Sequence, residues 1–122
     1  MKTKELLEQY YQGLKGNVDW PSLLADDFHF IGGDMTKPEP MVGRDAYVRV
    51  LQRLEPLFSK VTVDQQFIEG DRAFVLATYL WTFPKGVEQK GSVAELWSVK
   101  DGKLKSLTIF FDTGSFDRLA KG

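Results

Sequence analysis

The stretch Gly91–Phe116, GSVAELWSVKDGKLKSLTIFFDTGSF, holds two alternating apolar runs separated by the pair Asp101-Gly102. An Asp-Gly pair between two such runs is typical of a tight β-hairpin turn. We therefore predict two long antiparallel strands joined by a turn at Lys100–Lys103. The rest of the chain is expected to cover this hairpin.

One carboxyl group lies on an apolar face of the first of these strands. Because side chains alternate between the two faces of a strand, Glu95 shares its face with Val93, Trp97 and Val99. Burial of this side chain raises its pKa, because a dry environment disfavours the charged form. Two interpretations stay open here: a buried general acid, or a surface glutamate paired with a lysine or arginine.

The composition of the chain excludes several kinds of protein. With 122 residues, 43% of them hydrophobic, we expect one domain over residues 1–122 with a real core. A net charge of -1 without a basic run argues against nucleic acid as a partner. The chain has no cysteine and one histidine, His29, which excludes disulfides and thiolate zinc sites and argues against a multi-histidine metal centre.

The chain also gives no sign of a membrane partner. No apolar stretch approaches the roughly 20 residues of a membrane helix. The N-terminus, MKTKELLEQYY, is charged and lacks a secretory apolar segment. We expect a soluble, cytoplasmic protein.

Helical spacing of apolar residues dominates the first half of the chain. It predicts helices over Thr3–Lys15 and Arg44–Leu57, with Pro56 in the closing turn of the second. A short helix is expected to open at Asp19–Ser22 and to close at Asp26-Asp27, followed by a strand over Phe28–Ile31. The stretch 34–41, with two prolines, is expected to be loop.

From Lys60 apolar residues recur at every second position, which predicts strands around Val61–Phe67 and over Ala73–Phe83 and Leu104–Asp112. A helical turn is expected in the tail. The strand Ala73–Phe83 is apolar on both faces, so both faces must be covered. Helices are available for only one face. We therefore expect a homodimer through the sheet.

Three motifs carry a resemblance to a known family: Leu24–Phe28 (LADDF), Gly43–Tyr47 (GRDAY) and Ala94–Leu104 (AELWSVKDGKL). With Phe111–Gly114 (FDTG), they resemble the SnoaL-like, ketosteroid-isomerase-related proteins of the nuclear-transport-factor-2-like (NTF2-like) superfamily. The resemblance implies an α+β cone, in which a strongly curved mixed or antiparallel sheet wraps around N-terminal helices and leaves an internal apolar pocket. It implies no cofactor.

The resemblance also implies roles for particular residues. Ketosteroid isomerases use a tyrosine on the first helix and a protonated acid on a strand as hydrogen-bond donors, with an aspartate as base. By position, Tyr10 matches the tyrosine and Glu95 the acid, whereas the base position falls on Gly32, which has no side chain.

Three other groups are candidates for moving the proton. Asp34 follows Gly32 in the same phase, Asp112 stands where SnoaL-type cyclases place an acid/base aspartate, and His29 lies on the first strand. Each has a structural alternative: a solvated loop residue for Asp34, a cap for Asp112 and a surface residue for His29. The expected apolar walls of the pocket, or else ordinary core residues, are Trp81, Trp97, Phe111, Ile109 and Phe30.

Two functions remain open from the sequence. One is a cofactor-free isomerase, cyclase or dehydratase acting on a small apolar carbonyl compound, which the pair Glu95 and Tyr10 favours. The other is a module without catalysis that binds a small apolar molecule or serves in dimerisation, which the missing base at Gly32 favours.

Overall fold

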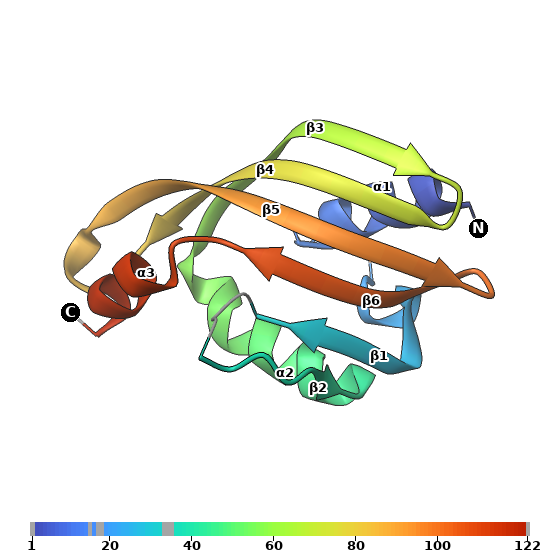
Figure 1. The fold of residues 1–122 in the computed structure, drawn as a ribbon. Coiled ribbons are helices and arrows are strands. Elements are labelled where there is room, and N and C mark those ends of the chain that lie inside the picture. Colours follow the sequence, from blue (N-terminus) through green and yellow to red (C-terminus); the bar gives the residue numbers. More distant parts are fainter. Residues whose placement is uncertain (1, 15, 17–18, 33–35, 122) are drawn as a thin grey trace.

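One curved, six-stranded sheet organises the molecule (Figure 1). The computed structural model describes residues 2–14, 16, 19–32 and 36–121. The strands follow the order β2-β1-β6-β5-β4-β3, and every neighbouring pair is antiparallel except β1 and β6. The elements are α1 Thr3–Leu14, η1 Pro21–Leu23, β1 Leu24–Ile31, β2 Met41–Val42, α2 Arg44–Leu54, η2 Glu55–Leu57, β3 Phe58–Glu69, β4 Arg72–Thr82, η3 Pro84–Gly86, β5 Glu88–Lys100, β6 Lys103–Phe110 and α3 Thr113–Ala120.

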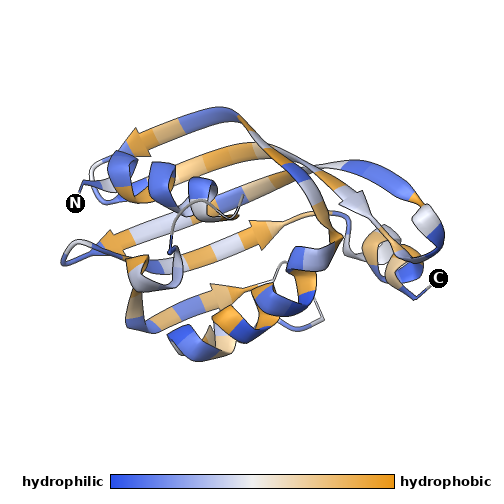
Figure 2. Ribbon diagram, turned by 180° about the vertical axis from the view of Figure 1, so that it is seen from behind, coloured by the Kyte–Doolittle hydropathy of each residue, from blue (hydrophilic) through white to orange (hydrophobic). Residues whose placement is uncertain are grey.

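The helices α1 and α2 lie on the same side of the sheet (Figure 2). Each buries the apolar stripe that its sequence spacing predicts, and this burial is the main favourable term holding helix to sheet. The buried side chains are Leu6, Leu7, Tyr10 and Tyr11 of α1 and Tyr47 and Leu51 of α2. No helix in the described part of the chain is long and apolar enough to span a membrane.

The predicted hairpin is present as β5 and β6. Its two turn residues, Asp101 and Gly102, have φ angles of 52° and 75°, the left-handed conformation that a two-residue hairpin turn requires. An aspartate tolerates this conformation better than most residues, and a glycine adopts it without steric cost. The turn residues therefore explain why the hairpin bends at this point.

The order of helices and long strands was predicted correctly, and the differences are local. The short helix expected from Asp19 is a single turn, Pro21–Leu23. Leu24–Asp27 already belong to β1, in which Leu24 pairs with Leu104 of β6. The short strand β2 lies at the end of the stretch expected to be loop. The helix expected to end at Leu57 passes into a 3-10 turn at Glu55–Leu57, where Pro56 has no N–H to continue α-helical bonding. The tail forms a two-turn helix, α3.

The two faces of the sheet differ in burial. From Ala73 onward, residues of β4 alternate between buried and half-buried, as expected for a strand that is apolar on both faces. The inner face, toward α1 and α2, holds Ala73, Val75, Ala77, Tyr79 and Trp81 of β4 and Val93, Glu95 and Trp97 of β5. The outer face is open in the single chain.

The edge strand β3 is irregular. Its register with β4 shifts at two places, between Phe58 and Lys60 and between Val63 and Gln65. Such shifts are β-bulges, which bend a strand and interrupt its ladder of hydrogen bonds.

Candidate functional site

Glu95 is enclosed at the centre of the inner face. Its exposed fraction is 1%, so of the two interpretations left open by the sequence the structure shows the buried one. Two tyrosine hydroxyls donate to Glu95 Oε1: Tyr11 from α1 at 2.8 Å and Tyr79 from β4 at 3.1 Å. Trp97 Nε1 in turn donates to the Tyr11 hydroxyl oxygen at 3.2 Å. The carboxyl group thus ends a chain of hydrogen bonds that crosses from helix to sheet.

Burial raises the pKa of Glu95 from 4.5 to about 7, because the charged carboxylate loses its hydration. The hydrogen bonds from Tyr11 and Tyr79 act in the opposite direction, since they favour the carboxylate. Burial also raises the pKa values of Tyr11 and Tyr79 well above 10, so both hydroxyls stay protonated and act as donors. Near neutral pH, Glu95 is therefore divided between a neutral acid and a carboxylate.

Tyr10 does not make the contact expected of it. Its hydroxyl pairs with that of Tyr47 on α2, at an O–O distance of 2.6 Å, and burial raises its pKa well above 10. The residue that meets Glu95 is its neighbour Tyr11. One residue turns a helix by about 100°, so only one of two adjacent tyrosines can face β4 and β5 at this height.

Aromatic rings fill the space around this carboxyl group. Tyr10 packs edge-on against Tyr11 and Trp97, with ring centroids 5.2 Å and 4.7 Å apart, and Phe28 and Tyr47 lie 4.9 Å apart on the other side. Glu95 lines none of the five main cavities and grooves that the described residues form. The internal pocket expected around Glu95 is thus closed by side chains.

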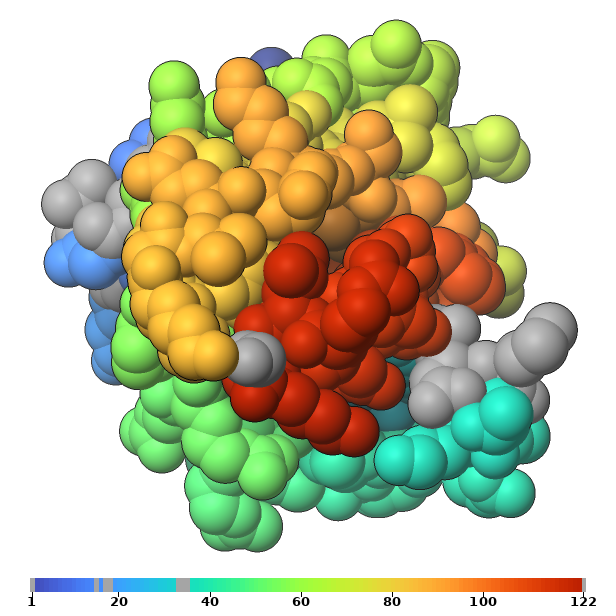
Figure 3. Space-filling view, turned by 90° about the vertical axis from the view of Figure 1, so that its left-hand side faces the viewer, coloured from blue at the N-terminus to red at the C-terminus, as the bar shows by residue number. Residues whose placement is uncertain are grey.

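A partly open cavity lies instead at the end of the sheet, beneath α3. It has a volume of about 330 Å³, and we call it the α3 cavity. Four aromatic residues form its walls, namely Trp81, Phe83, Phe111 and Phe116. The other lining residues are Gln89, Lys90, Gly91, Ser92, Val93, Asp112, Ser115, Arg118 and Leu119. Figure 3 views this end of the molecule, with α3 (red) beside the start of β5 (orange).

The helix α3 is held over the cavity by one ring and one cap. Phe116 meets Trp81, Phe83 and Phe111 edge-on, at centroid distances of 5.0, 5.4 and 5.6 Å. Asp112 is the N-cap, and its two carboxylate oxygens accept from Ser115 N at 2.9 Å and Ser115 Oγ at 2.7 Å. The hydrogen bond from the Ser115 backbone lowers the pKa of Asp112. Asp112 is therefore a capping residue at the rim of the α3 cavity.

The remaining predicted residues are spread over the fold. His29 alternates with Phe28 and Phe30, whose rings both pack on Tyr47, so its side chain is directed to the outer face. Asp34 lies outside the described residues. Gly32 is described, and among the described residues a Cβ built on it meets only the Phe30 ring, at 3.7 Å.

Of the five residues expected to line a pocket, the structure brings two together. Trp81 and Phe111 line the α3 cavity, with ring centroids 6.5 Å apart. Trp97 is 2% exposed and belongs to the core around Glu95. Ile109 is the cross-strand partner of Glu95, and Phe30 packs on Tyr47; neither lines the α3 cavity.

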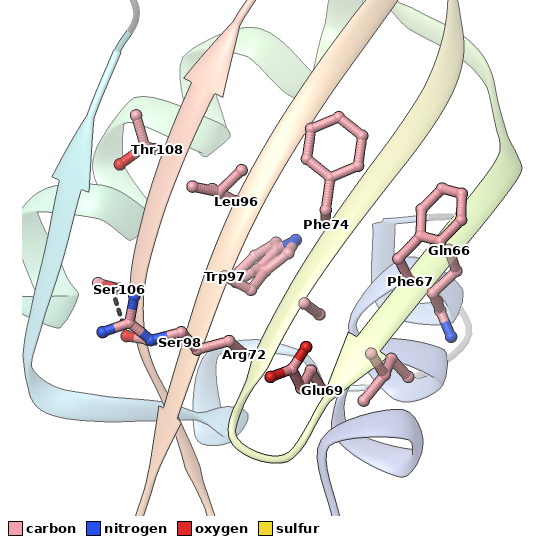
Figure 4. A pocket seen from close by; sticks show the side chains of 12 residues that line it. Gln66, Phe67, Glu69, Arg72, Phe74, Leu96, Trp97, Ser98, Ser106 and Thr108 are labelled. Atoms are coloured by element: carbon pink, nitrogen blue, oxygen red, sulfur yellow. Dashed lines mark hydrogen bonds between the residues drawn. The ribbon is translucent and has the colours of Figure 1, made fainter.

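Two larger depressions are more open to solvent. One, of about 920 Å³, runs between α1 and β3, and the other, of about 820 Å³, lies over the outer face. Figure 4 shows the second, where Phe67, Phe74, Leu96 and Thr108 come from four neighbouring strands. Their register places them in one row across the sheet.

Sequence reasoning missed two residues of the Glu95 cluster and the anchor of α3. Tyr79 has a readable signal, since it is in phase with Trp81 on the inward side of β4. Tyr11 follows Tyr10 directly, and helical spacing alone does not decide between adjacent residues. Phe116 lies in α3, which is only eight residues long, so the spacing of its apolar residues gives little evidence of which side is buried.

The curved sheet with helices on its inner face is the fold of NTF2-like proteins, as solved structures show. TerC, co-crystallised with polyporic acid, is 20% identical over 98% of each chain, with a TM-score of 0.81. A SnoaL-like polyketide cyclase homologue from Jannaschia sp. is 18% identical over 98% of this chain and 91% of its own, with a TM-score of 0.80. A ketosteroid isomerase-like protein from Catenulispora acidiphila, in complex with trimethylamine, is 16% identical over 98% and 94%, with a TM-score of 0.78.

Within that class, the family is set by a sequence match. The model of the SnoaL-like domain matches residues 7–107, and the chain therefore belongs to the SnoaL-like family. A comparison with curated proteins returns no match.

Proposed function

We propose that this protein binds a small apolar, aromatic molecule in the α3 cavity. The observation that carries the proposal is the set of four aromatic walls, Trp81, Phe83, Phe111 and Phe116, around a partly open volume of about 330 Å³. Sites for small molecules in proteins are typically of 300–1,000 Å³, mainly apolar, with a few polar groups at defined places. TerC and the Catenulispora protein, which share this fold, were crystallised with small organic molecules, and this supports the proposal.

Gly91 provides the test of this proposal. It lies on the inner face of β5 and lines the α3 cavity, and a Cβ built on it makes only an ordinary contact, at 3.8 Å from Trp81 Nε1. A valine at this position suits a β-strand and fills part of the cavity. Gly91→Val is therefore expected to weaken binding of a ligand at least tenfold without unfolding the protein.

The experiment is a titration of ¹⁵N-labelled protein with tetralin, a compact hydrocarbon with one aromatic ring, followed by NMR. Shifts are expected at Gly91, Val93 and the Trp81 indole, and not at Leu96 on the outer face. The matched control is Ala94→Val, which adds the same side chain to the outer face of the same strand. Binding that survives in Gly91→Val but not in Ala94→Val contradicts the proposal, because it places the ligand on the outer face.

Native mass spectrometry of the purified protein is expected to detect any such molecule that it carries from the cell.

A catalytic role is a second candidate, favoured by the pKa of Glu95 near 7. A general acid works best when its pKa lies near the working pH. Val93, which lines the α3 cavity, is the inward residue of β5 next to Glu95. Because rings close the space around Glu95, a ligand in the α3 cavity reaches this carboxyl group, with Tyr11 and Tyr79 as further donors, only if side chains beside Val93 move apart.

Catalysis has its own measurement. Incubation of 1-tetralone in D₂O with the protein exchanges the hydrogen next to the carbonyl if Glu95 assists enolisation, and NMR measures the rate. Glu95→Gln removes the acid but keeps the shape of the side chain. If exchange is no faster with wild type than with Glu95→Gln, Glu95 does not catalyse enolisation, and the protein is a binding module without this activity.

The outer face of the sheet supports a homodimer. Two rows of side chains, which we call the outer-face patch, expose apolar surface there. They are Phe67, Phe74, Leu76, Ala94, Leu96 and Phe110. Phe67, Leu96 and Phe110 are 60%, 47% and 51% exposed. A continuous apolar patch of this kind marks an interaction surface, and a second copy of the chain offers the same patch through a twofold axis.

A further inference from the structure

The ring of Trp81 is fixed in the wall of the α3 cavity. The indole is stacked between two rings. One belongs to Tyr79 of the same strand, at a centroid distance of 5.3 Å, and the other to Phe83, just after the strand, at 6.3 Å. Phe58 and Phe116 pack edge-on at 5.0 Å. With contacts on this many sides, the indole has little freedom to rotate, so the direction of its N–H is set by the fold.

The N–H of Trp81 has no acceptor among the residues that the structure describes. No described residue accepts a hydrogen bond from Trp81 Nε1, and no buried side-chain nitrogen or oxygen among the described residues lacks a partner. The Nε1 atom is therefore in contact with open space. Trp97 shows the usual situation for a buried indole, because its Nε1 donates to Tyr11.

Gly91 explains why the space in front of this N–H is open. It is the register partner of Tyr79, and a Cβ built on it is 3.8 Å from Trp81 Nε1. A side chain at this position would cover the donor. Glycine weakens the interior of a strand, and it often marks a place where a ligand approaches closely.

We propose that the ligand of the α3 cavity is a planar aromatic carbonyl compound whose carbonyl oxygen accepts a hydrogen bond from Trp81 Nε1. An indole N–H is a donor only, so it selects an acceptor oxygen and does not satisfy a hydroxyl that must donate. The aromatic part of the ligand packs on Phe111 and Phe116. This inference rests on the proposed function of the same cavity.

The test compares 1-tetralone with tetralin, which have the same ring skeleton and differ by the carbonyl group. Wild type is expected to bind 1-tetralone roughly five- to tenfold more tightly, the effect of one neutral hydrogen bond. In Trp81→Phe this preference is lost while tetralin still binds. In wild type, the Trp81 indole N–H resonance moves downfield with 1-tetralone and much less with tetralin.

The outcomes separate the two proposals. Equal affinity of wild type for both compounds, or the same indole shift with both, overturns the carbonyl inference and leaves the binding cavity in place. Binding of both compounds that is unaffected by Gly91→Val overturns the proposed function, and the carbonyl inference with it. The indole shift is measured on wild type, so the test does not depend on the folding of Trp81→Phe.

Discussion

The Tyr11 hydroxyl donates to Glu95 Oε1 at 2.8 Å and joins the first helix to the centre of the sheet. The donor lies in α1 and the acceptor in β5, so the contact forms only when this helix is packed on this strand. A neutral or charged carboxyl group accepts this hydrogen bond, but the charged form accepts it more strongly. The strength of the contact therefore depends on the protonation state of Glu95.

The stability of the protein should depend on pH through Glu95. Its pKa is about 7 in the folded protein and 4.5 ordinarily, so the folded state holds a proton that the unfolded state releases between these values. The free energy of unfolding therefore falls as pH rises from about 4.5 to about 7, by about 3 kcal/mol from this group, and is flat above. Urea unfolding at pH 5 to 8 measures the fall.

Glu95→Gln is expected to remove this fall, because the amide does not titrate in this range. The matched control is Glu69→Gln, at the exposed end of β3, which should keep the wild-type dependence. Identical pH dependence in wild type and Glu95→Gln would show that Glu95 is not protonated in the folded state near neutral pH.

Loss of one tyrosine hydroxyl should move the pKa of Glu95 upward. The hydrogen bond from Tyr79 favours the carboxylate, so Tyr79→Phe removes a stabilising contact to the charged form only. The expected rise is roughly one pH unit. Titration of the Glu95 carboxyl carbon by ¹³C NMR measures it, and Tyr47→Phe, whose hydroxyl pairs with Tyr10, is the control with a smaller effect. A pKa that falls in Tyr79→Phe contradicts the proposed arrangement.

A charge in the outer-face patch should separate the proposed homodimer. Leu96 is 47% exposed at the centre of this patch, so Leu96→Glu leaves the core intact but places two carboxylates in the interface. Sedimentation is expected to show a dimer for wild type and a monomer for Leu96→Glu. Val42→Glu, at a residue 58% exposed on β2, should remain dimeric. A wild-type monomer at all concentrations tested rules out the dimer.

A single methyl group at Gly13 should destabilise the fold. A Cβ at this position lies 2.4 Å from the Cβ of Trp20, an atom that cannot move without its backbone. Gly13→Ala is expected to lower the free energy of unfolding by about 1–3 kcal/mol. Gly114→Ala in α3 is the control, because its Cβ comes no closer than 3.6 Å to Asp112 Oδ1 and alanine favours a helix. Equal stability of the two variants would mean that α1 moves freely away from Trp20.

The sequence allowed the fold to be predicted because local signals agree with tertiary structure along most of the chain. The alternation of residues placed Glu95 on an apolar face of its strand, and Asp101-Gly102 predicted the hairpin turn. The choice between Tyr10 and Tyr11 depends on how α1 is rotated against the sheet, and packing alone decides that. The α3 cavity was not predictable either, since it forms where a short terminal helix rests on residues from β4, β5 and the end of β6. The family resemblance led us to expect the pocket around Glu95, whereas in this chain aromatic side chains fill that space.

The two register shifts in β3 have a consequence for how the protein behaves at high concentration. A straight outermost strand is a template on which further chains add by backbone pairing, and this growth leads to fibrils. The shifts at Ser59 and Asp64 bend β3 and break the regular spacing of its free N–H and C=O groups. Open-ended edge-to-edge stacking is thereby disfavoured, which leaves closed pairing through the face of the sheet as the easier route of self-association.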